Sequence, residues 1–73
     1  ELCLSARLEV DYLNEKYNLD LPESEAYETL GGLLVENFER IPNEGAEITI
    51  RNYTFTAQQV SETRIEKVLL KSD

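Results

Sequence analysis

Carboxylates are the most abundant side chains in this sequence that could do chemistry. Aspartate and glutamate together number 15, against seven lysines and arginines. Six of the acids form two groups along the chain, a run of Asp20, Glu23, Glu25 and Glu28 and a second cluster of Glu44 and Glu47. Hard cations such as calcium and magnesium bind several oxygen ligands that a scaffold brings together, so a cation-sensing acidic cluster is one hypothesis. The spacing matches no calcium-loop pattern, however, and favours a solvated acidic rim with no metal ligands.

The residues of the commonest catalytic arrangements are missing. The sequence contains no histidine, which excludes an imidazole base, a cysteine–histidine dyad and a histidine-ligated zinc. It also has no glycine loop of the phosphate-binding kinds and no nucleophile elbow. Its single cysteine, Cys3, cannot form an internal disulfide, and we expect an inert thiol in a packed or edge-facing position. We therefore predict no enzyme, no catalytic residues and no cofactor.

Two adjacent glycines, Gly31 and Gly32, stand where a helix is expected to begin. Each costs about 1 kcal/mol of helix propensity relative to alanine, so a bare backbone must be needed there. An anion bound by the helix N-terminus would use such a backbone, and so would close packing of the helix start against a neighbouring segment. The acidity of the chain and the lack of a nearby basic residue in the sequence favour packing.

The formal charge of −8 indicates which classes of partner this chain could bind. Such a charge repels nucleic acid and anionic lipid headgroups, which disfavours binding to either. No apolar run approaches the roughly 20 residues that cross a bilayer, so we expect no membrane insertion. Solubility alone explains the charge, and attraction to a basic protein surface is an alternative.

Residue periodicity predicts two helices and four strands. Apolar residues recur at helical spacing over 8–17 and again over 30–39, with Asn18 as a left-handed stop and Thr29 as an N-cap. Residues 19–28 read as an ordered connection pinned by Leu19, Leu21 and Tyr27. Alternation with a period of two marks strands near residues 2–4, 48–50, 53–57 and 65–70. This order predicts an α+β fold, strand-helix-helix-strand-strand-strand, with two helices on one face of an antiparallel sheet.

The strand pattern also contains irregularities. The alternation slips between Ala57 and Val60 and again between Ile65 and Val68, so we expect a β-bulge or strong twist at one or both places. A tight connection is expected at Asn52. The aromatic residues have core-compatible spacing, with an exposed tyrosine as one available anchor for a partner.

Length and the first residue bear on domain organisation. A chain of 73 residues forms one small domain, residues 1–73. It begins with Glu1 and contains no methionine, which favours a domain excised from a longer protein.

The pattern from Ser5 to Leu70 resembles the CorC/HlyC transporter-associated domain. The segments that carry the resemblance are spread over nearly the whole chain: Arg7-Leu8, Leu13-Asn14, residues 19–22, residues 29–32, Ile41-Pro42 with Gly45, Phe55, and Arg64-Ile65 with Val68. The run Thr29-Leu30-Gly31-Gly32, followed at this distance by Pro42-x-x-Gly45, is its most specific part. The chain departs from the pattern at Ala6, Ala46 and Asn52-Tyr53, where glycine or an acid is usual.

The resemblance implies a fold similar to a lobe of certain flavin-binding domains, without implying flavin. It implies a C-terminal module on the cytoplasmic side of haemolysin-like membrane proteins that are linked to magnesium and cobalt efflux. Its partners would be the other domains of that protein, a pair of CBS domains and the transmembrane region. Independently of the resemblance, an edge strand of the expected meander could pair with a second copy, which gives a homodimer as an alternative partner. The expected role is to modulate ion transport through protein contacts, with no catalytic residues to carry over.

Overall fold

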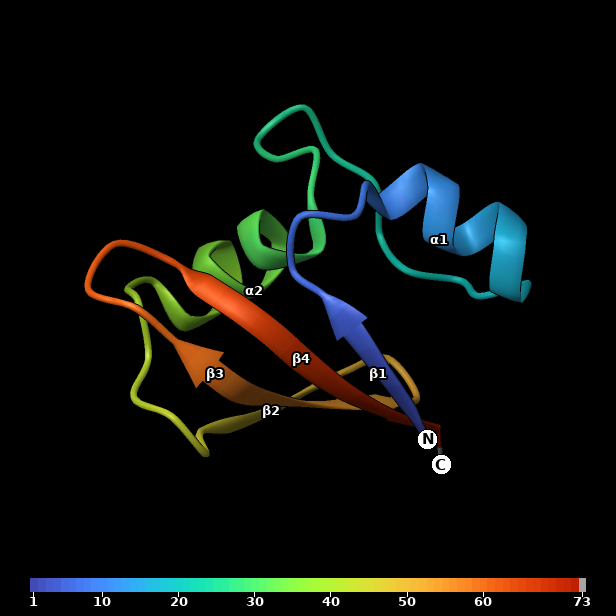
Figure 1. Ribbon diagram of the computed structural model, residues 1–73. Coiled ribbons are helices and arrows are strands. Elements are labelled where there is room, and N and C mark those ends of the chain that lie inside the picture. The colour runs from blue at the N-terminus through green and yellow to red at the C-terminus, as the bar shows by residue number, and fades with distance from the viewer. Residues whose placement is uncertain (73) are drawn as a thin grey trace.

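Two helices lie on one face of a four-stranded antiparallel sheet (Figure 1). The computed structural model describes residues 1–72, so the predicted domain of 1–73 extends one residue beyond the described part. The elements in chain order are β1 (Leu2–Ser5), α1 (Val10–Tyr17), α2 (Leu30–Phe38), β2 (Glu47–Ile50), β3 (Tyr53–Val60) and β4 (Ile65–Ser72). The predicted α+β class and order of elements are confirmed.

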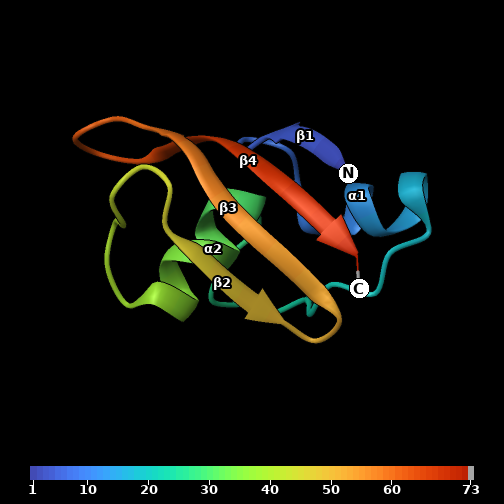
Figure 2. The ribbon, with the colours of Figure 1, turned by 90° about the horizontal axis from the view of Figure 1, so that it is seen from below.

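The sheet has the strand order β1-β4-β3-β2, so the first and last strands of the chain are neighbours (Figure 2). Strands β2, β3 and β4 form a meander, and β1 pairs with β4 from Leu2 opposite Leu70 to Ser5 opposite Lys67. The start of β1 and the end of β4 consequently lie side by side at one end of the molecule (Figure 1). The opposite end gathers the β1–α1 connection, the start of α2 and the β3–β4 loop.

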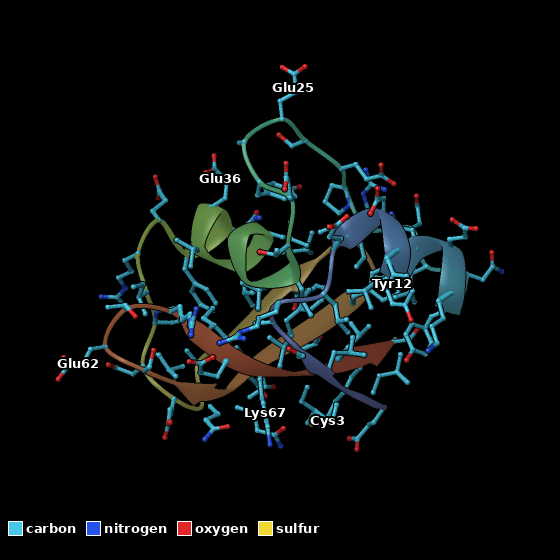
Figure 3. The ribbon with its side chains drawn as sticks, turned by 45° about the horizontal axis from the view of Figure 1, so that its top comes forward. Cys3, Tyr12, Glu25, Glu36, Glu62 and Lys67 are labelled. Atoms are coloured by element: carbon cyan, nitrogen blue, oxygen red, sulfur yellow. The ribbon has the colours of Figure 1, made fainter. Side chains whose placement is uncertain are left out.

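The core lies between the helices and the sheet. It contains the helical residues that the 3.6-residue period selects and the strand residues that alternate toward the same side. Its buried members are Leu4, Ala6, Val10, Leu13, Leu21, Leu30, Leu33, Leu34, Phe55, Ala57, Ile65, Val68 and Leu70. The opposite face of the sheet is polar, and Cys3 and Lys67 point away from the helices there (Figure 3).

Both predicted irregularities in the strands are present. Ala57 lies opposite Val68 and Gln59 opposite Lys67, which leaves Gln58 as an extra residue in β3. The next pair joins Val60 to Ile65, which leaves Glu66 as an extra residue in β4. The two shifts compensate, so that Ile65 and Val68 both reach the core although three positions separate them.

The first helix begins two residues later than predicted. Leu8 lies in a bend and Glu9 is extended, because their backbone pairs with the segment before α2. The Val10 N–H donates to the Glu28 carbonyl at 2.9 Å, and the Leu30 N–H donates to the Leu8 carbonyl at 2.9 Å. Asn18 ends α1 with a φ of 55°, as predicted, and Glu39 ends α2 with a φ of 63°. The expected tight connection at Asn52 is present as the turn between β2 and β3, in which Arg51 is left-handed with a φ of 57°.

The connection over residues 19–28 is held to α1 by an asparagine side chain. The Asn14 side-chain amide donates to the Leu21 carbonyl at 2.9 Å, and its Oδ1 accepts from the Leu21 N–H at 2.8 Å. These two hydrogen bonds satisfy the N–H and carbonyl of Leu21 as a neighbouring strand would, so Leu21 can lie buried in the core. The expected ordered connection is thus confirmed.

Candidate functional site

Close packing at the start of α2 accounts for the two glycines. A Cβ on Gly31 would lie 3.2 Å from both the Cβ and the carbonyl oxygen of Ala6, and a Cβ on Gly32 would lie 2.9 Å from the Tyr27 Cβ. Real Cβ atoms essentially never approach another heavy atom below 3.0 Å. The helix start is therefore pressed against the β1–α1 connection on one side and the 19–28 connection on the other. The packing interpretation is confirmed.

The amides at the start of α2 are already bonded within the protein. The Gly31 N–H donates to the Ala6 carbonyl at 2.9 Å, and the Gly32 N–H donates to Thr29 Oγ1 at 3.1 Å, which confirms the predicted N-cap. The Leu30 N–H bonds to the Leu8 carbonyl. An anion at this helix end would find none of these three donors free, although free donors are what make helix N-termini anion sites.

A groove lies beside this helix start, where the end of β1, the start of α2, the segment after α2 and the β3–β4 loop meet. We call it the α2 groove, and its volume is about 600 Å³. Its small and apolar lining consists of Ala6, Gly31, Gly32, Val35, Ile41 and Ile65. Its polar lining consists of Arg7, Thr29, Thr63 and Arg64. Two arginines and no acidic residue line it, on a chain with a formal charge of −8. Arg7 also lines a neighbouring cavity together with Glu44 and Glu66.

The α2 groove brings together four of the separate segments on which the family resemblance rests. Arg7, the glycines of the 29–32 run, Ile41 and Arg64 all line it, although they are as many as 57 positions apart in sequence. Arg64 pairs through Nε with Glu66 Oε2 at 3.1 Å, and the ion pairs among the described residues do not include Arg7. Ile41 is 39% exposed. Sequence reasoning identified these residues singly and did not predict that they meet.

The acidic run does not form one cluster. The Asp20 carboxylate pairs with Arg51 Nη1 at 3.0 Å, and the same nitrogen donates to the Asp20 carbonyl at 2.8 Å. The Glu23 carboxylate accepts from the Asn14 side chain at 3.0 Å. Glu25 projects into solvent from the tip of its loop (Figure 3). Asp20 therefore anchors the connection to the β2–β3 turn.

Two members of the run do share a small cleft. Glu23 and Glu28 line it together with Glu9 and Asp11, two acids that the sequence analysis did not single out. In residues 1–72 no three histidine, cysteine or acidic side chains are placed to hold one metal ion. The arrangement therefore resembles a solvated acidic rim more closely than a coordination sphere.

The second acidic cluster and the cysteine form hydrogen bonds with residues of the sheet. Glu44 Oε2 accepts from the Val60 N–H at 3.0 Å, so this carboxylate covers a backbone donor at the edge of β3. Glu47 Oε2 accepts from the Thr56 hydroxyl at 3.3 Å. The Cys3 thiol is exposed and donates to Gln58 Oε1 at 3.1 Å, so it lies on the polar face of the edge strand β1 and is not packed in the core.

The aromatic residues divide between core and surface. Phe55 is fully buried, whereas Tyr12 and Tyr17 are 46% and 36% exposed. Lys16 Nζ lies 5.6 Å from the centre of each of these two rings, and the Tyr12 hydroxyl raises the pKa of Lys16. Tyr27 donates its hydroxyl to the Pro22 carbonyl at 2.6 Å, and burial raises the pKa of that phenol.

None of the helices in residues 1–72 is long and apolar enough to span a bilayer. The groups gathered at the α2 groove are arginines, threonines and aliphatic side chains, which can bind and orient a ligand. They include no histidine, cysteine, lysine or carboxylate.

Comparison with known proteins gives consistent matches. A family model described as the transporter associated domain, CorC_HlyC, matches residues 1–73. The protein UPF0053 YegH of Escherichia coli K12 is 40% identical over 50 residues, which make up 68% of this chain. Those residues are only 10% of YegH, so the chain spans about a tenth of that relative.

Solved structures of similar modules have the same fold. The transporter associated domain CorC_HlyC from Nitrosomonas europaea superposes with a TM-score of 0.86 at 28% identity, over 97% of this chain and 85% of that chain. A CorC_HlyC domain of a Xylella fastidiosa Temecula1 hemolysin, solved in complex with Mg²⁺ and Mn²⁺, superposes with a TM-score of 0.84 at 24% identity, over 97% and 85%. Both solved chains are little longer than this module, which therefore folds without further domains in those relatives.

Proposed function

Since this chain belongs to the CorC_HlyC family of transporter-associated domains, we propose that it is a non-enzymatic accessory domain of a haemolysin-like membrane ion transporter. The transporter is of the type that exports magnesium and cobalt, and the domain modulates transport through protein contacts. The match of the family model to all 73 residues carries the proposal. The composition of the α2 groove supports it, because that groove offers binding groups without a catalytic base.

The partners follow from the same proposal. A module that spans a tenth of a relative such as YegH needs other domains to form the transport path. We propose that these are a transmembrane region and a pair of CBS domains in the same polypeptide, with this module on the cytoplasmic face of the membrane. Nucleic acid is disfavoured as a partner because the chain carries eight excess negative charges. A homodimer through the free edge of β1 or β2 stays an alternative.

Cation sensing by the acidic run has less support from the geometry. Asp20 is turned toward Arg51, and Glu25 points into solvent. A cation sensor at the cleft of Glu9, Asp11, Glu23 and Glu28 would have to draw these side chains together. Thermal melts with magnesium or cobalt test it: a saturable rise in Tm that Glu23→Gln and Glu28→Gln abolish would favour a sensor over a contact module.

The proposal is tested in the full-length protein that carries this module. Cells that express the intact protein and cells that express it without the module are loaded with cobalt, and the loss of cellular cobalt is followed over time. The two proteins must be present in the membrane in equal amounts, which immunoblotting of the membrane fraction checks. We expect efflux to proceed in both cells at clearly different rates. Equal rates at equal expression would contradict a modulatory role.

A further inference from the structure

We infer that the α2 groove is the docking site for a linear peptide segment that combines acidic with apolar side chains, and that this segment belongs to the transporter. The inference rests on the proposed function, because it names the surface through which the module makes its contacts. It starts from Ile41, which is 39% exposed beside a half-buried Val35. An apolar partner side chain would remove both from water.

The charges of the residues that line the α2 groove indicate which kind of peptide segment would bind there. The chain has 15 acidic residues, yet none of them lines the groove, whereas Arg7 and Arg64 both do. Arg64 uses its Nε for Glu66, which leaves the terminal nitrogens of its guanidinium as donors. Among residues 1–72, Arg7 is in none of the ion pairs. Guanidinium groups hold carboxylates through paired hydrogen bonds, so an aspartate or glutamate next to the apolar side chain complements the groove.

Other ligands with negative charge fit less well. An inorganic anion would gain no backbone donors, because the amides of Leu30, Gly31 and Gly32 are already bonded. A nucleic acid or an anionic membrane presents a dense array of negative charge to a protein with a formal charge of −8. A short peptide segment would present one or two carboxylates to the two arginines, and the other acidic surfaces of this chain would remain in solvent. Its apolar side chains also match the Val35 and Ile41 part of the lining.

Overlapping peptides of about 15 residues that cover the remainder of the transporter serve as probes. Each is labelled and titrated with the isolated module by fluorescence anisotropy. We expect at least one peptide with adjacent acidic and apolar residues to bind, and the double variant Arg7→Glu with Arg64→Glu to weaken that binding at least tenfold. Ile41→Ser should weaken it severalfold without changing charge, which separates apolar docking from a purely ionic effect.

The matched control is Lys16→Glu with Lys71→Glu. It makes the same change in net charge on α1 and at the end of β4, and neither residue lines the groove. We expect this control to bind the peptide within about twofold of the unchanged module. Circular dichroism melts verify that each variant is folded, and the exposed positions of Arg7 and Arg64 predict small shifts in Tm.

Three results would overturn the inference. The first is that no peptide binds, and the second is that both double variants weaken binding equally. The third is Arg7- and Arg64-dependent binding of the module to phosphatidylserine vesicles, which would make the groove a membrane contact. Failure of the proposed function has a separate signature: deletion of the whole module would then leave cobalt efflux unchanged, whatever the groove binds.

Discussion

Gly32→Ala is the substitution for which the structure predicts a sign opposite to that of helix propensity. In an open helix the change would stabilise the protein by about 1 kcal/mol, because alanine is the better helix former. Here the added Cβ would lie 2.9 Å from the Tyr27 Cβ and 3.3 Å from Thr29 Oγ1. The Tyr27 Cβ is attached directly to the backbone, so it cannot rotate away as the end of a flexible side chain can.

The magnitude follows from these two opposing effects. Overpacking in a tight site costs about 1–3 kcal/mol, and a contact below 3.0 Å with a backbone-attached atom belongs near the top of that range. After the propensity gain is subtracted, we expect a net loss of about 1–2 kcal/mol. For a domain of this size the loss lowers Tm by roughly 5–15 °C, measured by circular dichroism and by urea unfolding.

Two companion variants make the result interpretable. Glu36→Ala lies in the same helix at a position that projects away from the sheet, so it should shift the free energy of unfolding by less than about 0.5 kcal/mol (Figure 3). Gly45→Ala has nothing within 4 Å of the new Cβ, but a φ of +89° makes it strained by about 1 kcal/mol. A Gly32→Ala protein that melts at or above the Tm of the unchanged chain would refute the packing explanation of the glycine pair.

Two further stability predictions concern the 19–28 connection. Asn14→Ala removes both hydrogen-bond partners of the Leu21 backbone and should lower the free energy of unfolding by about 2–4 kcal/mol. The control Asn37→Ala, at an exposed position, should lower it by less than about 1 kcal/mol. Similar losses for the two variants in urea unfolding would contradict the role of Asn14. The raised pKa of Tyr27 means that the folded state retains the phenol proton to higher pH than the unfolded state does. The protonated phenol therefore contributes its full stabilisation below about pH 10, and this stabilisation is lost as pH rises through the folded pKa. We therefore expect Tyr27→Phe to be less stable than the unchanged chain by about 1 kcal/mol at pH 7, and this difference to shrink above pH 10. Urea unfolding from pH 7 to 11 measures the difference. A difference that stays constant over this range would contradict the stabilising role of the protonated Tyr27 hydroxyl.

The parts of the fold that depend on local chemistry could be predicted from the sequence. Thr29 before a helical apolar period marks the start of α2, and Asn18 after such a period marks the end of α1. The slips in alternation at Ala57–Val60 and Ile65–Val68 located both bulges because a register shift has to appear in the pattern of burial.

Features that depend on distant segments could not be predicted in this way. The start of α1 was expected at residue 8, but Leu8 pairs with Leu30 across 22 positions, and no local signal reports such a pairing. A tight connection at Asn52 was expected and is present, but the left-handed conformation of the neighbouring Arg51 could not be anticipated from its residue type. The Arg51 guanidinium contacts both the carboxylate and the carbonyl of Asp20, 31 positions earlier in the chain.

The candidate site shows the same division. Gly31 and Gly32 could be identified as a place of close packing, since two poor helix formers at a helix start require a reason. Their contact residues, Ala6 and Tyr27, emerge only from the tertiary structure. The α2 groove could not be predicted at all, because its two arginines lie 57 positions apart and meet only through the antiparallel order of β1 and β4.

The most direct test of the account is ion flux through the purified full-length transporter in vesicles, measured with the module present, with the module deleted, and with the isolated module added back to the deleted protein. A contact module predicts that deletion changes the rate of magnesium or cobalt flux and that the added module restores the original rate. The Arg7→Glu and Arg64→Glu module should fail to restore it. A rate that is the same in all three preparations would contradict the central claim that this domain modulates transport.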